Sequence, residues 1–79
     1  MQLKKWNNKT AVYDDYNVLD EWKVKTYSGD MEEIINCAQC GKEVKVGETY
    51  TSLEVHTEVG FGYLVCPQCY EQEHKRRDV

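Results

Sequence analysis

Four cysteines are the residues of this sequence best placed to do chemistry. Cys37 and Cys40 form one C-x-x-C pair, and Cys66 and Cys69 form a second. Two intervening residues let both sulfurs of a pair converge on one ion, and the chain between the pairs is long enough to fold back as a hairpin. Four thiolates in a closed tetrahedron make a structural zinc site. The spacing therefore predicts one structural Zn²⁺ held by all four cysteines.

Disulfide bonds are the alternative use of four cysteines. Small secreted proteins rely on them, but short C-x-x-C pairs are poorly placed to join distant loops. The first residues include Lys4 and Lys5 but no apolar run of signal-peptide length, and no stretch is long enough for a membrane helix. We therefore expect bound metal, a cytoplasmic location and no membrane partner.

The residues around each pair indicate the backbone that holds it. Gly41 directly follows Cys40 and permits the tight turn of a zinc knuckle. In the second pair a proline precedes acidic and then basic residues, the order that suits a helix from about Pro67 to Arg77. Cys69 would then lie in the first helical turn, where the helix dipole favours a thiolate.

This succession of knuckle, β-hairpin and helix resembles the treble-clef zinc fingers, which include LIM-like modules. The resemblance covers Cys37 to about Arg77 and rests on the motifs C-A-Q-C-G-K and C-P-Q-C-Y. It implies a small zinc-stabilised α+β fold, here with extra β-strands on the N-terminal side. Treble clefs serve as binding modules, ribosomal proteins and HNH nucleases, so the resemblance leaves the activity open.

Length and charge set further bounds. A chain of 79 residues has room for one domain, and a core of that size needs a staple such as zinc. We expect a single domain over 1–79, with an arm and strands over 1–36 and the zinc-finger module over 37–79. The net charge is −4, and four thiolates on a divalent ion make it more negative. This balance favours a protein partner over a nucleic acid.

The first twenty residues carry weaker signals. Residues 1–10 show little periodicity, so we expect a loosely ordered arm whose Trp6 packs against the sheet. The run from Thr10 to Leu19 is rich in β-branched and aromatic residues around Asp14 and Asp15. That pattern indicates two short extended pieces joined by a solvated turn at the aspartates.

The next stretch leads into the first cysteine pair. From Glu21 to Tyr27, Trp22 and Val24 alternate with lysines, which is typical of a half-buried strand. Residues 31–36 allow two interpretations. An aspartate followed three residues later by a glutamate resembles the capping box of one helical turn, whereas the preceding glycine turn and the two isoleucines favour a strand. Because a lone helical turn is marginal, we prefer the strand.

Between the cysteine pairs, Glu48 to Val59 indicates one long strand and Val59 to Tyr63 the tip of a hairpin. Alternation divides the strand into two faces. We expect the buried face to carry Thr51, Leu53, Val55 and Thr57. The solvent face would carry Tyr50, Ser52, Glu54, His56 and Glu58.

Candidate binding residues lie at the hairpin tip and in the C-terminal tail. Phe61 stands between two glycines, where it is either an exposed anchor for a partner or folded back over the sheet. Tyr63 would extend that surface. Lys75, Arg76 and Arg77 could contact a partner protein or nucleic acid, although they also compensate the helix dipole.

An enzyme is the minority hypothesis. His56 resembles the hairpin histidine of HNH nucleases, but the other histidine and the asparagine expected with it are not apparent. His74 lies about 140° from Cys69 around a helix and should not share its face. A zinc ion with four thiolates has no open position for chemistry. We therefore expect no catalytic residues.

Together these observations favour a small zinc-binding protein that acts as a protein-interaction module, as a regulator or adaptor. A nucleic-acid-binding finger is the alternative, and an HNH-like nuclease is a remote one. We expect a monomer or a homodimer, since an exposed strand edge in the N-terminal half could pair with a second copy.

Overall fold

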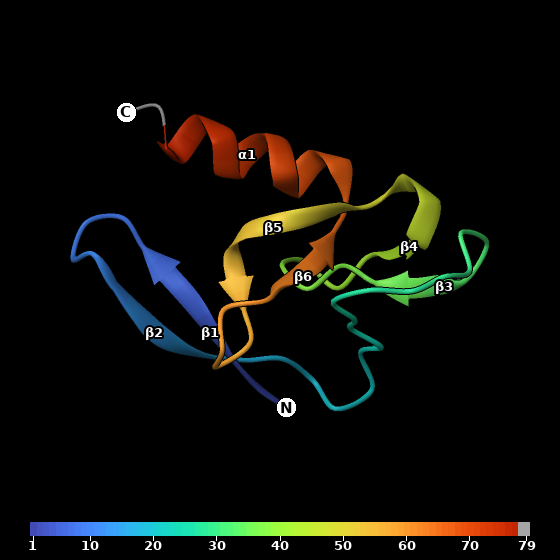
Figure 1. The fold of residues 1–79 in the computed structure, drawn as a ribbon, viewed down its shortest axis with the longest axis horizontal. Helices are drawn as coiled ribbons and strands as arrows, with labels where there is room; N and C mark the ends of the chain where they lie inside the picture. Colours follow the sequence, from blue (N-terminus) through green and yellow to red (C-terminus); the bar gives the residue numbers. More distant parts are fainter. Residues whose placement is uncertain (78–79) are drawn as a thin grey trace.

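The structure is a computed structural model that describes residues 1–77 and the side chains of residues 1–76. In this part of the chain it is a small mixed α+β fold with one α-helix and two antiparallel sheets (Figure 1). The elements in chain order are β1 (Gln2–Asn7), β2 (Val12–Asn17), β3 (Ile34–Asn36), β4 (Glu43–Lys45), the 3-10 turn η1 (Val46–Glu48), β5 (Tyr50–His56), β6 (Gly62–Val65) and α1 (Pro67–Arg77). One sheet has the order β2-β1-β5-β6, and β3 pairs with β4 in the other.

The N-terminal residues form a regular hairpin, so the predictions of a loose arm and of a turn at the aspartates were wrong. β1 pairs with β2 along its whole length, from Gln2↔Asn17 to Asn7↔Val12. The turn lies earlier than expected because Asn7 closes it: its Oδ1 accepts a hydrogen bond of 2.9 Å from the backbone N–H of Lys9. Trp6 is half-buried and packs edge-on against Tyr13, 5.1 Å between ring centroids.

The burial of β5 also differs from the expectation. Ser52 and Glu54 are buried, at 2% and 3% exposure, although alternation placed them on the solvent face. The cause is α1, which packs against β5 and covers that face (Figure 1). The pairing of β5 with β6 also shifts register between Thr51 and His56. Val55 is fully buried in the core, as predicted.

A strap of residues 21–27 joins the two sheets, where we had predicted a strand. No described residue in it has strand pairing, so that prediction was wrong, although Trp22 and Val24 do pack against the core. The Lys23 carbonyl accepts a hydrogen bond from the Asn36 N–H at 3.0 Å, and the Lys25 carbonyl accepts one from Leu64 at 2.8 Å. The strap thus bonds to β3 on one side and to β6 on the other.

Residues 34–36, directly before the first cysteine pair, form β3, which confirms the strand interpretation for them, while Met31 and Glu32 lie in a turn. The core extends from this strand through the cysteines to the four-stranded sheet. Its buried members are Leu3, Val18, Ile35, Cys37, Ala38, Val44, Val46, Val55, Tyr63, Leu64, Val65 and Cys66.

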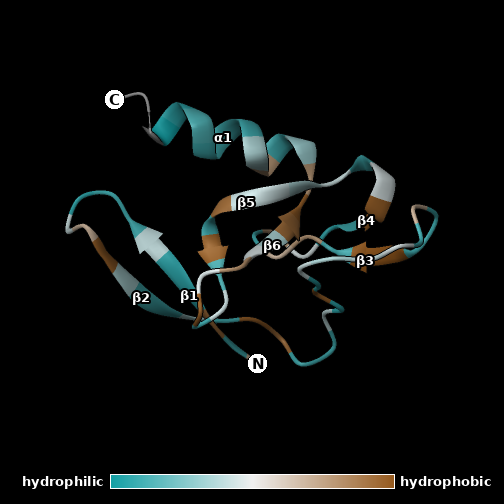
Figure 2. Cartoon of the chain, viewed as in Figure 1, coloured by the Kyte–Doolittle hydropathy of each residue, from teal (hydrophilic) through white to brown (hydrophobic). Residues whose placement is uncertain are grey.

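The helix contributes little apolar surface to this core. Figure 2 shows α1 hydrophilic along most of its length, while the apolar colouring concentrates in the strands. Only Cys69 and Tyr70 of the described α1 side chains are partly buried hydrophobic neighbours of the core, and the fully buried one is Glu73. Within residues 1–77, no helix is long and apolar enough to cross a membrane.

Candidate metal centre

The four cysteine sulfurs converge at the junction of the knuckle and the helix. The Sγ atoms of Cys37, Cys40, Cys66 and Cys69 all lie within 4.8 Å of one another, and none of the four is in a disulfide. The sulfurs of Cys40 and Cys66 are 3.9 Å apart. A tetrahedral ion with bonds of about 2.3 Å to each sulfur requires sulfur separations of about 3.8 Å. The donor set and its spacing therefore fit one thiophilic ion such as Zn²⁺.

The first pair is held by a tight backbone turn after β3. The N–H of Gly41 donates to the carbonyl of Cys37 at 2.9 Å, and the N–H of Cys37 donates to Lys42 at 2.8 Å. Gly41 has φ of +78°, a left-handed conformation that suits glycine. Its missing side chain also makes room for the ring of Trp22, which a Cβ at this position would strike.

The second pair spans the junction of β6 and α1. Cys66 follows the last strand residue, and Tyr70 donates its N–H to the Cys66 carbonyl at 3.0 Å to close the first turn of the helix. Cys69 lies in that turn, as the sequence predicted. Cys37 and Cys66 are buried, Cys69 is half-buried and Cys40 is exposed. Solvent therefore reaches the cluster from the Cys40 side.

The protonation of these thiols reflects their crowding. Burial raises the pKa of Cys37, and burial together with the neighbouring sulfurs raises the pKa of Cys69. For Cys66 burial acts in the same direction, but hydrogen bonds from the Cys69 backbone and from nearby thiols outweigh it and lower the pKa. Four thiols this close together cannot all ionise without a cation that compensates their negative charges. A bound dication would supply that compensation.

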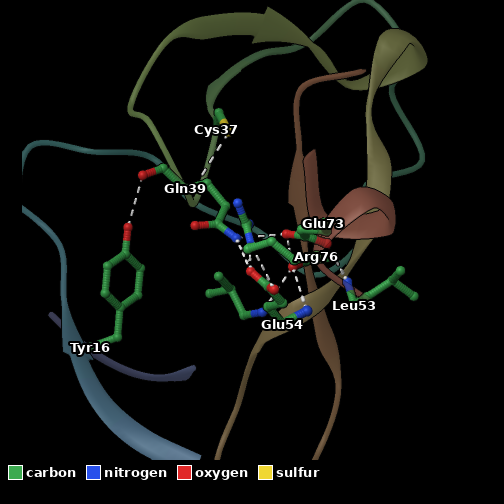
Figure 3. A network of polar contacts seen from close by, with 9 residues as sticks. Tyr16, Cys37, Gln39, Leu53, Glu54, Glu73 and Arg76 are labelled. Atoms are coloured by element: carbon green, nitrogen blue, oxygen red, sulfur yellow. Dashed lines mark hydrogen bonds and ion pairs between the residues drawn. The ribbon is translucent and has the colours of Figure 1, made fainter. Parts of the chain in front are cut away.

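Gln39, inside the first C-x-x-C pair, links the cluster to the rest of the fold (Figure 3). Its backbone N–H donates to the Cys37 sulfur at 3.4 Å, and its carbonyl accepts from the Tyr16 hydroxyl at 2.9 Å. Its side-chain Nε2 donates to Glu54 at 3.0 Å and to Glu73 at 2.7 Å. Gln39 thus contacts one of the clustered cysteines, the N-terminal hairpin, β5 and α1.

The two carboxylates that receive Gln39 are themselves fully bonded. Glu73, at 0% exposure, also accepts from the Ser52 hydroxyl and from the Leu53 N–H, each at 2.7 Å. Glu54 accepts two hydrogen bonds from Arg76, Nε at 3.0 Å and Nη2 at 2.7 Å. Burial would raise the pKa of Glu54, but the bonds from Arg76 and Gln39 outweigh it and lower the pKa. This polar network docks the helix on β5.

Sequence reasoning missed this network, although a signal for it exists. Glu73 and Arg76 follow Cys69 by four and seven positions, which places all three on one face of a helix. Because Cys69 must face the knuckle, Glu73 and Arg76 must face it too. His74 does not share this face, and its exposed ring packs against Tyr70 at 4.6 Å between centroids, outside the sulfur cluster.

The candidate partner residues lie in different settings. Phe61 is 67% exposed at the hairpin tip, whereas Tyr63 is buried at 8%. Lys75 is exposed and pairs with Glu71 at 3.6 Å, and Arg76 is committed to Glu54. The side chain of Arg77 lies outside the described residues. Of the four whose side chains are described, Phe61 and Tyr63 belong to the β5–β6 hairpin, and Lys75 and Arg76 belong to α1.

His56 occupies the end of β5, and its ring packs edge-on against Tyr13 at 5.4 Å between centroids. The His56 ring therefore joins β5 to the N-terminal hairpin of β1 and β2.

Comparisons of the chain with protein-family models, with curated proteins and with solved structures found no match.

Proposed function

We propose that this chain is a zinc-stabilised interaction module that binds another protein, as a regulator or adaptor. The observation that carries the metal assignment is the convergence of four cysteine sulfurs within 4.8 Å. All-thiolate tetrahedral sites are characteristic of structural zinc. The free thiols that such a site requires also favour a reducing compartment such as the cytoplasm.

The order of elements supports a treble-clef type of zinc finger. The knuckle of Cys37 and Cys40 comes first, the β5–β6 hairpin follows, and α1 begins within the second pair. In such a scaffold the metal joins the knuckle to the helix, which matches the small apolar contribution of α1.

Binding rather than catalysis is the proposal because four thiolates leave the zinc no open position for substrate or water. The hairpin tip supports a protein partner. Phe61 is 67% exposed and Val59 is 79% exposed in the same loop, and exposed aromatic anchors often dominate small interfaces. The acidic net charge of −4 is compatible with such a role.

The nucleic-acid alternative has less support. Of the three basic tail residues, Lys75 and Arg76 are paired with glutamates. Binding of oligonucleotides at low salt that weakens steeply as salt increases would favour it over a protein partner.

Native mass spectrometry with circular dichroism tests the zinc assignment. We expect one zinc ion per chain and loss of both the ion and the folded signal after a strong chelator. A folded, metal-free chain would overturn the assignment, as would a mass showing that the thiols have been oxidised.

Chemical crosslinking in cell extract followed by identification of captured proteins tests the partner. Phe61→Ala should reduce capture of a specific protein. Val59→Ala, in the same loop and at a more exposed position, should reduce it less because Val59 has no aromatic ring. Equal capture by wild type and Phe61→Ala would remove the hairpin tip from the proposal.

A further inference from the structure

The outer edge of β2 is the one long strand edge that the described chain leaves uncovered. In the order β2-β1-β5-β6, the edge strands are β2 and β6. On β6, the backbone groups of Leu64 that point away from β5 are already hydrogen-bonded. Its N–H donates to the Lys25 carbonyl, and its carbonyl accepts from the Ala38 N–H. Beside β2 no backbone of residues 1–77 supplies such partners. An open edge of this kind is a template for one more strand.

The register of the hairpin identifies the backbone groups at this edge. Val18 donates its N–H to the carbonyl of Met1 at 3.0 Å, which makes this pair a hydrogen-bonded one. Hydrogen-bonded and non-bonded pairs alternate along an antiparallel ladder, so Tyr16, Asp14 and Val12 also point their backbone groups at β1. The residues between them therefore direct N–H and carbonyl groups away from β1: Tyr13, Asp15 and Asn17.

The side chains along this edge are acidic at the centre and apolar at one end. Asp14 and Asp15 are exposed, and Val12 and Tyr13 are 50% and 48% exposed. Asp15 forms an ion pair with Lys4 of β1. Asp14 stands opposite Lys5 of β1 and accepts a hydrogen bond from the neutral side-chain amide of Asn7, at 3.1 Å. Two adjacent carboxylates thus stand beside the free backbone groups, one on each face of the sheet.

These carboxylates oppose pairing with a second copy. In a two-fold antiparallel pair of β2 strands, the registers that use most of the outward groups place Asp14 opposite Asp14 or Asp15 opposite Asp15 of the other copy. Directly opposed residues lie about 5 Å apart, and like charges there are destabilising. The same geometry favours lysine or arginine at the opposed positions.

We propose that the outer edge of β2 docks an extended segment of a partner protein, with basic side chains opposite Asp14 and Asp15. This rests on the protein-binding function proposed above and assigns it a surface distinct from the hairpin tip. Backbone hydrogen bonds to Tyr13, Asp15 and Asn17 hold the segment, and the two carboxylates select its charge.

The probe is a capped eight-residue peptide of valine and threonine with two adjacent lysines at its centre. Titrated into the ¹⁵N-labelled, zinc-loaded protein, it should shift the amide resonances of Tyr13, Asp15 and Asn17 and slow their hydrogen exchange. A peptide with glutamates in place of the lysines should bind at least about tenfold more weakly, since two charge pairs change sign.

Two N-methylated isomers of the lysine peptide test the backbone contact itself. Methyl groups on alternate amides block one edge of an extended peptide and leave the other edge free. One isomer should bind and the other should not. Equal binding of both isomers would overturn the proposal and reduce the interaction to charge attraction alone.

Charge variants give the matched control on the protein side. The double variant Asp14→Asn with Asp15→Asn should weaken lysine-peptide binding about tenfold. Glu43→Gln with Glu48→Gln removes the same number of exposed charges from β4 and the turn after it, outside the sheet that contains β2, and should change lysine-peptide binding little. Equal effects of the two variants would overturn the proposal.

The same peptide separates this site from the general protein-binding function. If the peptide fails while a protein is still captured through Phe61, the edge proposal fails and the binding function stands. If the peptide binds at β2 but no protein is captured from extract, the proposed cellular function fails and the edge site stands.

Discussion

Nε2 of Gln39 lies 2.7 Å from Oε2 of Glu73, so the loop inside the first cysteine pair is hydrogen-bonded to a fully buried carboxylate of α1. The sulfurs of the second pair converge with those of the first pair beside this loop. A metal ion bound by both pairs would therefore act between the same two segments as this hydrogen bond. The helix has little apolar surface, and the hydrogen bonds of Glu73 and Arg76 to Gln39 and β5 hold it on the sheet.

Replacing Gln39 tests the contribution of this connection. Gln39→Leu removes the donor shared by Glu54 and Glu73 and leaves two buried carboxylates short of a hydrogen bond. We expect the free energy of unfolding of the zinc-loaded protein to fall by about 2–3 kcal/mol in urea denaturation. Gln68→Leu is the control, since Gln68 holds the equivalent position in the second pair and is exposed. Equal losses in the two variants would contradict the role of Gln39.

Two glycines with left-handed backbones separate conformational strain from packing. Gly41 and Gly60 have φ of +78° and +96°. Gly60→Ala should lower the free energy of unfolding by about 1 kcal/mol, which is the cost of a left-handed backbone for alanine. No steric cost is added, because a Cβ there meets nothing within 4 Å. Gly41→Ala should cost about 1–3 kcal/mol more, since its Cβ would strike the ring of Trp22. Urea denaturation measures both, and equal costs would contradict the tight contact of Trp22 with the knuckle.

The pH dependence of one carboxylate follows from its neighbours. Hydrogen bonds from Lys23, Lys25 and Ser28 lower the pKa of Glu33 to about 2 from an ordinary value of 4.5. The contribution of the ionised Glu33 carboxylate to the free energy of unfolding is therefore fully present above pH 4.5 and is lost as the pH falls toward 2.

The measurement compares urea denaturation of wild type and Glu33→Gln. The difference in unfolding free energy should be constant from about pH 8 to about pH 5, because Glu33 is ionised in both the folded and the unfolded state there. Glu32→Gln, which removes a more exposed partner of Lys45, should have a smaller effect. A difference between wild type and Glu33→Gln that declines within this range would contradict the lowered pKa.

The turn of the N-terminal hairpin contains a strained alanine. Ala11 has φ of +56°, and a left-handed conformation costs an L-residue about 1–2 kcal/mol. Ala11→Gly should raise the unfolding free energy by about 0.5 kcal/mol, after subtraction of the greater freedom of glycine in the unfolded chain. Ala11→Val should lower it, since β-branching disfavours this conformation further. Thermal denaturation of the zinc-loaded protein would show opposite shifts, and shifts of the same sign would contradict the strain.

The parts of the fold that the sequence predicted are those with local causes. The helix from Pro67 and the strand before Cys37 follow from residues within each segment. The convergence of the sulfurs follows from their spacing. The hairpin of β1 and β2 was missed because its turn signal, the side chain of Asn7, was read as part of an unstructured arm.

The buried polar network depended on long-range packing. Alternation along β5 assigned Ser52 and Glu54 to solvent because it cannot show that a helix returns to cover that face. A buried carboxylate is also acceptable only when donors from several segments meet it, as Gln39, Ser52 and Leu53 meet Glu73. The positions of these three donors in the sequence do not show that they lie around one carboxylate; only the fold shows it.

The strap of residues 21–27 has a consequence for how the molecule opens. The Lys23 carbonyl accepts from Asn36 in β3 and the Lys25 carbonyl accepts from Leu64 in β6, so the two sheets cannot move apart without breaking a backbone bond to the strap. Amide protons on the two sheets should then exchange with solvent through a shared opening event rather than sheet by sheet. Similar exchange free energies for the Asn36 and Leu64 amides would be the signature of that cooperativity.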